Sequence, residues 1–223
     1  MSTILDIQNL SKAIKGRRLL ENIQLKIEKP GVYGIVGRNG SGKSVLFKTI
    51  AGLLVPTEGT VKVFNENIGK GNFPRNFGAL LDTPGFLPQY SGFQNLKLLA
   101  SIQNRVSEEE LKKVISFVGL DPDDKVSVRK YSLGMKQRLG IAQAIMEKPN
   151  FLILDEPMNG LDESGVNDIR RMILSFKKQG MTILLASHNA EDISLLCDVV
   201  YKMDNGHLTL AVNEISHDSV GIE

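Results

Sequence analysis

The chain has 223 residues, 42% of them hydrophobic, and a net charge of +2, which together describe an ordinary globular protein of one domain. A charge so close to neutral argues against a protein that coats nucleic acid, and no nucleic-acid partner is expected. Its one cysteine, Cys197, excludes an internal disulfide and fits a reducing compartment. No apolar run has the roughly 18 residues that a membrane span requires, and the first residues lack a signal-peptide pattern, which predicts a cytoplasmic location.

The first third of the chain is dominated by strand patterns. Alternating apolar and polar residues, or short apolar runs, predict strands at residues 4–9, 23–28, 32–36, 61–64 and 77–81. One helix is expected among them, from about Lys43 to Gly52.

The pattern becomes helical between about residues 92 and 146. Helices are predicted at residues 93–102, 107–118 and 134–147. The second should begin with a capping box, because Ser107 is followed three residues later by Glu110.

Strands and helices alternate in the last third. Strands are predicted at 151–154, 182–186 and 199–203 and after Gly206, and helices at 162–178 and 190–196. Such alternation is typical of an α/β protein with a largely parallel sheet and helices on both faces. We therefore expect one domain over residues 1–223, with a helical subdomain inserted at about 83–147.

The segment at residues 37–44 matches G-x-x-x-x-G-K-S between a predicted strand and a predicted helix. Its glycines allow successive backbone N–H groups to surround a β-phosphate, and the helix N-terminus adds partial positive charge. Lys43 would reach the β- and γ-phosphate oxygens, and the Ser44 hydroxyl would ligate Mg²⁺. The predicted nucleotide-binding residues are Gly37, Arg38, Asn39, Gly40, Ser41, Gly42, Lys43 and Ser44.

Polar side chains follow two of the predicted buried strands, at the edge where α/β sheets bind ligands. Asp155 would hold Mg²⁺ through water, and Glu156 would act as the general base on the attacking water. His188 would donate a hydrogen bond to a γ-phosphate oxygen. Taken alone, the Asp-Glu pair could equally begin an ordinary loop, and His188 could cap the following helix.

A second glycine-marked motif, Tyr131-Ser132-Leu133-Gly134-Met135, opens a predicted helix but has no phosphate site of its own. One complete and one incomplete phosphate motif in the same chain suggest that two copies close on each other's nucleotide.

The order of these motifs resembles that of the nucleotide-binding domain of ABC ATPases over essentially the whole chain. The resemblance is carried by the phosphate loop, Tyr131–Met135, Ile153-Leu154-Asp155-Glu156-Pro157, Gly160-Leu161-Asp162 and Ser187-His188. The second and third of these segments are most similar to bacterial exporter-type subunits, including those for bacteriocin, lantibiotic or bacitracin efflux.

The resemblance implies a P-loop NTPase fold with a mostly parallel core sheet, an antiparallel β-subdomain and an inserted helical subdomain. It implies a Mg²⁺-dependent ATPase that drives export of a peptide, antibiotic or lipid through a separate integral membrane permease. The chain would then lie at the inner face of the cell membrane through that permease.

The resemblance also implies that two such domains, identical or different, enclose two ATP molecules. The signature residues Ser132, Leu133, Gly134 and Met135 would face the ATP held by the partner. Asp162 would lie at the dimer seam.

Two positions depart from the family pattern near the nucleotide. Asp82 stands where a glutamine is usual, and it could still contact Mg²⁺ or water. Ile14 stands where an aromatic residue commonly stacks on adenine. It could contact the base without stacking, or it could belong to the core.

The loop at residues 82–93 occupies the position that receives a membrane subunit in the family. Its aromatic residues, Phe86, Tyr90 and Phe93, could anchor that interface or pack the helical subdomain.

Two other functions compete with the transporter motor. One is a soluble ABC-type ATPase, such as an iron–sulfur assembly protein, although the short stretch between residues 44 and 132 leaves no room for the long coiled coil of chromosome-associated members. The other is a module that binds ATP without hydrolysing it, against which the presence of Glu156 and His188 argues.

Overall fold

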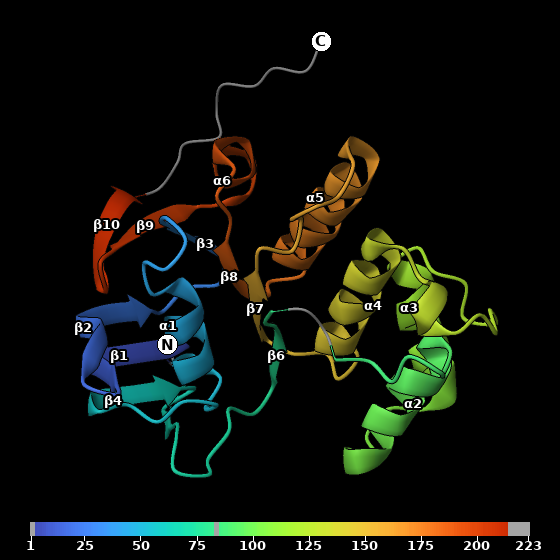
Figure 1. The fold of residues 1–223 in the computed structure, drawn as a ribbon, viewed down its shortest axis with the longest axis horizontal. Helices are drawn as coiled ribbons and strands as arrows, with labels where there is room; N and C mark the ends of the chain where they lie inside the picture. Colours follow the sequence, from blue (N-terminus) through green and yellow to red (C-terminus); the bar gives the residue numbers. More distant parts are fainter. Residues whose placement is uncertain (1–2, 83–84, 214–223) are drawn as a thin grey trace.

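A six-stranded sheet forms the centre of the molecule (Figure 1) in a computed structural model that describes residues 3–82 and 85–213. The strand order is β10-β9-β3-β8-β7-β6. The strands are β3 (Val32–Val36), β6 (Phe77–Leu80), β7 (Phe151–Asp155), β8 (Thr182–Ala186), β9 (Val199–Asp204) and β10 (His207–Asn213). All neighbours pair in parallel except β9 and β10, which form an antiparallel hairpin.

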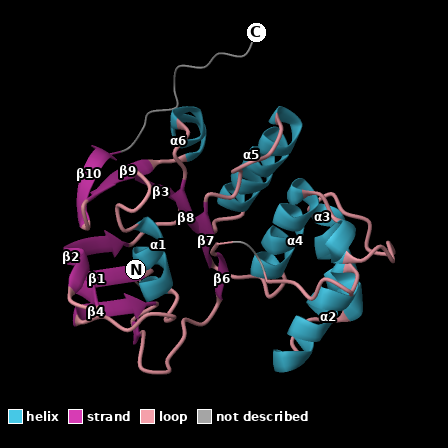
Figure 2. Ribbon diagram, viewed as in Figure 1, coloured by secondary structure: helices cyan, strands magenta, loops and turns pink. Residues whose placement is uncertain are grey.

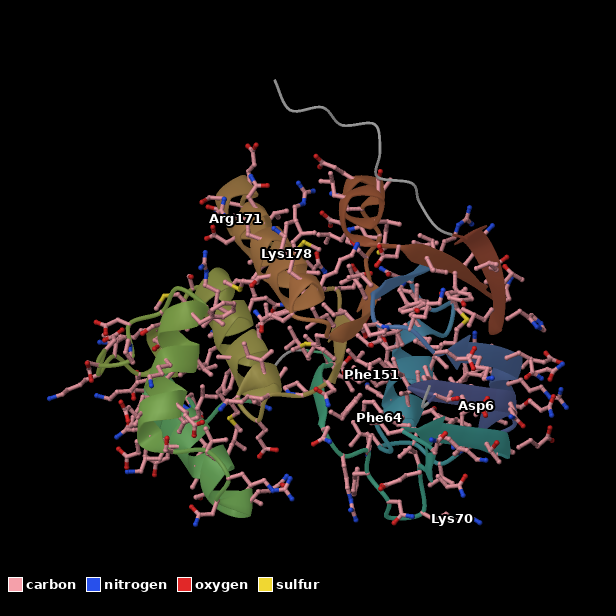
Figure 3. The ribbon with its side chains drawn as sticks, turned by 180° about the vertical axis from the view of Figure 1, so that it is seen from behind. Asp6, Phe64, Lys70, Phe151, Arg171 and Lys178 are labelled. Atoms are coloured by element: carbon pink, nitrogen blue, oxygen red, sulfur yellow. The ribbon has the colours of Figure 1, made fainter. Side chains whose placement is uncertain are left out.

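Strands β7 and β8 are buried on both faces, as their unbroken apolar runs predict. In β7, Phe151 and Ile153 face one hydrophobic core, whereas Leu152 and Leu154 face the other, because successive side chains of a strand point to opposite faces. Figure 3 shows Phe151 in the interior of the molecule, where it is fully buried. The two strands that carry the predicted carboxylates and histidine are therefore held from both sides.

A second, antiparallel sheet has the order β2-β1-β4-β5. Its strands are β1 (Leu5–Ile14), β2 (Arg17–Ile27), β4 (Glu58–Val63) and β5 (Glu66–Asn67). The predicted strands at 4–9 and 23–28 are much too short, because β1 and β2 form one long hairpin. Asn9 and Asn22 have left-handed φ values of 49° and 47°, and the pairing register shifts beside Asn9, which hides the alternation from sequence reading.

Helices cover the central sheet on both faces (Figure 2). Helix α1 (Lys43–Ile50) packs Leu46, Phe47 and Ile50 into the core shared by the two sheets. Helices α5 (Glu163–Lys178) and α6 (Ala190–Leu196) contribute to the core on the opposite face. The arrangement places the start of α1 beside the carboxyl ends of β3, β7 and β8.

The helical segment lies to one side of the sheets (Figure 1) and comprises α2 (Gly92–Gln103), α3 (Glu108–Phe117), a 3₁₀ turn (Val128–Lys130) and α4 (Leu133–Ile145). The predicted helices are confirmed within two residues at each end. Their apolar side chains join the core beneath α5, so the segment is continuous with the sheet. Among residues 3–82 and 85–213, no helix combines the length and apolar character that a membrane crossing requires.

Ser107→Ala is expected to lower the free energy of unfolding by about 1 kcal/mol. The predicted capping box is present, because the Ser107 hydroxyl accepts the Glu110 N–H at 3.2 Å and the Glu110 carboxylate accepts the Ser107 N–H at 3.0 Å. Urea unfolding would measure the change, and Ser116→Ala, at an exposed position on the same helix, should cost much less. Equal losses for the two variants would contradict a capping role.

Candidate functional site

The phosphate loop joins β3 to α1 in a conformation that requires glycine at two positions. A Cβ atom on Gly37 would lie 2.3 Å from the carbonyl oxygen of Met203, which is backbone and cannot give way. Gly42 has φ +118°, a value that side-chain-bearing residues avoid, and an added Cβ would lie 2.9 Å from the carbonyl oxygen of Leu19. The Gly206 N–H donates to the Ser41 carbonyl at 2.9 Å, so the β9–β10 hairpin supports the loop from behind.

Lys43, the first residue of α1, directs its ammonium group back over the loop. Its Nζ donates to the Gly37 carbonyl at 2.7 Å and lies 3.9 Å from Glu156 Oε1. The side chain is only 6% exposed. No side chain caps the start of α1, so its first N–H groups have no side-chain acceptor. A buried cation and an uncapped helix N-terminus together suit an anionic ligand.

Ser44 and Asp155 lie together at the edge of the sheet, as predicted. The Ser44 hydroxyl donates to Asp155 Oδ2 at 2.7 Å. Burial raises the pKa of the Asp155 carboxyl, and the negative charges of Glu156 and Asp82 raise it further, against the lowering effects of Ser44 and Lys43. Because burial disfavours the charge of Asp155, a bound divalent cation would relieve that penalty, and the two oxygens suit Mg²⁺ chemically.

Asp155→Asn is expected to raise the free energy of unfolding of the nucleotide-free protein at neutral pH. The folded state raises the pKa of Asp155 above its ordinary 3.8, so ionisation of this carboxyl opposes folding once the pH exceeds the folded-state pKa. The wild type regains this stability as the pH falls through that pKa, so the advantage of the variant should shrink in acid.

Urea unfolding at pH 7 and pH 4, without nucleotide or Mg²⁺, measures both effects of Asp155→Asn. Asp204→Asn, at an exposed position on β9, is the control and should show neither effect. A variant less stable than the wild type at pH 7, or an advantage that grows in acid, would contradict this account of Asp155.

Glu156 follows β7 directly and adopts an uncommon left-handed backbone, with φ 51°. Its N–H donates to the Ala186 carbonyl at 3.1 Å, which ties the residue to the end of β8. Its Oε2 lies 2.8 Å from Nδ1 of His188, so the structure brings the predicted base and the predicted histidine together. The His188 side chain is 62% exposed and reaches Glu156 from the next strand along the sheet.

Two buried side-chain oxygens lack a hydrogen-bond partner in the described ranges, namely Ser41 Oγ and Glu156 Oε1. Such groups are rare in folded proteins because an unpaired buried oxygen costs about 1–3 kcal/mol. One belongs to the phosphate loop and the other to the predicted base. The Glu156 oxygen, which lies 3.9 Å from the Lys43 ammonium, is therefore placed where a ligand or a water molecule could satisfy it.

A cleft of about 460 Å³ opens over Lys43, Ser44, Asp155 and Glu156, whereas the predicted site residues Gly37, Ser41 and His188 do not line it. It is lined by Arg17, Leu19, Arg38, Asn39, Gly40, Gly42, Lys43, Ser44, Val45, Asp155 and Glu156. A cavity of similar size, about 490 Å³, lies between the ends of α3 and α5 and includes none of the predicted site residues. The cleft is therefore the candidate nucleotide site.

Sequence reasoning missed Arg17 and Leu19, which line the cleft from the start of β2. Nothing in the sequence around them indicates a nucleotide site, because only the folding of the β1–β2 hairpin brings them close to the phosphate loop. Ile14 is 41% exposed, so the core alternative for it is wrong. It does not line the cleft, but it pairs across the hairpin with Arg17. A contact between Ile14 and a base stays a prediction.

Asp82 forms an ion pair with Lys48 of α1, with 2.6 Å between Nζ and Oδ2. Its side chain is 58% exposed, although its charge contributes to the raised pKa of Asp155. The adjoining residues 83–84 lie outside the described ranges. Asp82 is thus near the carboxylate cluster but is engaged elsewhere, and contact with a metal stays a prediction.

The signature residues lie away from this cleft, at the start of α4, and none of them lines it. Ser132 caps α4, its hydroxyl accepting the Met135 N–H at 3.2 Å, and it is exposed. Leu133 is 51% exposed. A Cβ on Gly134 would meet only ordinary contacts, the nearest at 3.6 Å.

Asp162 is likewise an exposed helix cap. Its Oδ1 accepts the Gly165 N–H at 3.0 Å at the start of α5. The segment before it touches the signature, because a Cβ on Gly160 would lie 2.7 Å from Leu133 Cδ2. The signature and the predicted seam residue therefore form one exposed surface.

The aromatic residues at positions 82–93 divide between the two predicted roles, which were packing of the helical subdomain and contact with a membrane subunit. Phe86 and Phe93 are partly buried and pack against the core, as the packing alternative predicts. Tyr90 is 41% exposed and is therefore available to a partner.

Comparison with known sequences shows the family of the chain. A family model described as "ABC transporter" matches residues 20–159. The Bacillus subtilis (strain 168) protein YybJ, named as an uncharacterized ABC transporter ATP-binding protein, is 45% identical over 92% of this chain and 94% of its own length. The lantibiotic transport ATP-binding protein SrtF of Streptococcus pyogenes is 38% identical over 93% of this chain and 90% of its own length. The bacitracin transport ATP-binding protein BcrA of Enterococcus faecalis is 38% identical over 96% of this chain and 70% of its own length.

Solved structures show the same fold. A nucleotide-free ATP-binding cassette from an ABC transporter aligns with a TM-score of 0.84 and 26% identity over 95% of this chain and 92% of that one. The cassette MJ1267 in its ADP conformation gives a TM-score of 0.81 and 26% identity over 94% of this chain and 90% of that one. The chain therefore belongs to the ABC transporter family of ATP-binding proteins.

Proposed function

We propose that the chain is the ATP-hydrolysing motor of an ABC exporter and acts through a transmembrane subunit on a separate chain. The observation that carries this proposal is that the buried ammonium of Lys43, the Ser44–Asp155 pair and Glu156 line one cleft, while His188, which does not line it, contacts Glu156. These are the parts that phosphoryl transfer to water requires: a phosphate grip, a metal site and a base.

The mechanism assigns each residue a step. Lys43 exchanges its bond to the Gly37 carbonyl for the β- and γ-phosphate oxygens. Ser44 and Asp155 would hold Mg²⁺, which would supply positive charge against the phosphate oxygens. Glu156 accepts a proton from the attacking water as the water oxygen bonds to the γ-phosphorus, while the bond from the γ-phosphorus to the β–γ bridging oxygen breaks and ADP leaves. His188 donates a hydrogen bond to the same phosphate.

The exposed signature supports a dimer. Ser132 and Gly134 lie outside their own cleft at a helix N-terminus, where a hydroxyl and backbone N–H groups suit an anion. We assign them to the γ-phosphate of a second, facing subunit, with Leu133, Met135 and Asp162 at the seam. Each cleft is then completed by the other chain. The second subunit can be a copy of this chain or a related domain.

The whole of residues 1–223 is proposed as one nucleotide-binding domain, with the helical insertion at about 83–147, because a single core runs from α4 to β7 and α5. The names of the relatives BcrA and SrtF indicate a peptide antibiotic as the exported substrate. The chain would work at the inner face of the membrane through its permease.

Two measurements test the proposal. The chain purified with its permease should hydrolyse ATP only when Mg²⁺ is present, and a peptide antibiotic should stimulate it. Tyr90→Glu should weaken retention by the permease without changing the hydrolysis rate of the isolated chain, whereas Leu210→Glu, at an exposed position on β10, should change neither. Stable association with a soluble scaffold and none with a membrane protein would favour the soluble ATPase instead.

A further inference from the structure

The backbone that carries His188 is anchored by a buried polar network. His188 lies just after β8, and its side chain is mostly exposed. Within residues 3–82 and 85–213, the ring forms a hydrogen bond with Glu156 and no other. An exposed ring with a single partner has considerable rotational freedom, so its aim depends on how firmly its backbone is held. The residues on either side of His188 provide that hold.

Ser187 is the centre of the network and is only 3% exposed. Its hydroxyl donates to Asp192 Oδ2 at 3.0 Å and accepts the Asn189 N–H at 3.1 Å. One hydroxyl therefore ties the residue before His188 to the residue after it, and both to helix α6. Neither bond involves nucleotide or metal.

Asp192 is itself 2% exposed, and its charge is matched from the neighbouring helix. Arg170 of α5 donates to Asp192 Oδ1 from Nε at 2.8 Å and from Nη2 at 2.6 Å. It also reaches Glu191 at 2.8 Å. A buried carboxylate needs such a partner, because leaving it unpaired is strongly unfavourable. The pair fixes α6 on α5, so the anchor of His188 extends to the rigid core.

We propose that Ser187, Asp192 and Arg170 are positioning residues that set the orientation of His188 for ATP hydrolysis. They touch neither the phosphate loop nor the cleft, and they act on the reaction through His188 alone. This inference rests on the proposed function, which gives His188 its contact with the γ-phosphate. Its distinguishing consequence is that their effects vanish when the His188 imidazole is absent.

The first test compares steady-state ATP hydrolysis by matched variants of the full chain. Ser187→Ala should lower kcat about tenfold and change KM for ATP less than twofold, because the orientation of His188 affects the transition state more than ATP binding. A tenfold loss corresponds to about 1.4 kcal/mol of transition-state stabilisation. Ser187→Thr keeps the hydroxyl and should restore the rate. Arg170→Gln should resemble Ser187→Ala. Arg171→Gln is its control, because Arg171 lies on the side of α5 turned away from α6 (Figure 3) and pairs with Asp168.

The second test is a double-mutant cycle. In a His188→Ala background, Ser187→Ala should change kcat less than twofold. A further tenfold loss there, or full activity of Ser187→Ala in the wild-type background, would overturn the proposal. Thermal unfolding of each variant separates these results from a loss of folded protein, because a structural role alone would lower the midpoint in both backgrounds and leave kcat per folded chain unchanged.

The third test observes the ring directly. The imidazole Cε1–H resonance of His188 should shift or broaden in Asp192→Asn, while that of His207, on β10, should not move. This readout is independent of turnover. If His188→Ala leaves hydrolysis intact, the role given to His188 in the proposed function fails. Unchanged His188 resonances in Asp192→Asn would defeat the positioning role whatever the rate.

Discussion

Glu156→Gln is expected to slow ATP hydrolysis about a thousandfold, within the range that a positioned general base contributes. The amide has the same shape as the carboxylate and can still form a hydrogen bond with His188, but it cannot take a proton from water. In the described residues Oε1 of Glu156 accepts no hydrogen bond, so it can accept one from the attacking water. Single-turnover measurement of phosphate release would detect the loss.

The same variant should trap the dimer. If two chains enclose ATP, blocking hydrolysis removes the step that separates them, and Glu156→Gln should elute as a dimer in ATP and a monomer without it. Glu109→Gln, at an 83% exposed side chain on α3, should behave as the wild type in both assays. Unchanged phosphate release in Glu156→Gln would remove this residue as the base, and a monomer at saturating ATP would count against the shared site.

Lys43→Ala is expected to weaken ATP binding about a hundredfold. A charge-assisted hydrogen bond contributes about 1.5–3 kcal/mol, and each 1.4 kcal/mol changes the dissociation constant tenfold. The Lys43 ammonium is nearly buried and rests on a loop carbonyl, so its movement to the phosphates requires little rearrangement.

Isothermal titration with ATP and Mg²⁺ measures the effect of Lys43→Ala. Lys113→Ala removes a 74% exposed lysine on α3 and should bind ATP as the wild type does. Equal affinities for Lys43→Ala and the wild type would show that the backbone of the loop alone holds the nucleotide, and would remove Lys43 from the proposed mechanism.

The elements that sequence reading predicted best are those whose patterns are local and uninterrupted. Strand β8 was predicted to the residue, because its apolar run is bounded on both sides by polar or turn-forming residues. Strands β1 and β2 were underestimated, because left-handed Asn9 and Asn22 interrupt their alternation. The start of helix α3 was predicted closely, because the two residues of its capping box are only three positions apart in the sequence.

The candidate site also combines residues that local motifs predict with residues that they do not predict. The phosphate loop and Asp155-Glu156 are contiguous motifs, and the structure places them in one cleft. Arg17 enters that cleft from a hairpin distant in sequence, and Arg170 meets Asp192 only because α5 packs on α6. Such contacts depend on how elements assemble, and no spacing along the chain marks them.

The support behind the phosphate loop has a consequence for the length of a working protein. Every nucleotide motif ends by residue 188, yet the phosphate loop packs against the β9–β10 hairpin. The Met203 carbonyl in β9 excludes any side chain at position 37, and the Gly206 N–H in the following turn donates to the Ser41 carbonyl. A chain truncated after its last recognisable motif would keep every chemical group of the site. It would lose the β9–β10 hairpin, against which the phosphate loop packs. The phosphate loop can therefore bind a triphosphate only after the β9–β10 hairpin has joined the central sheet.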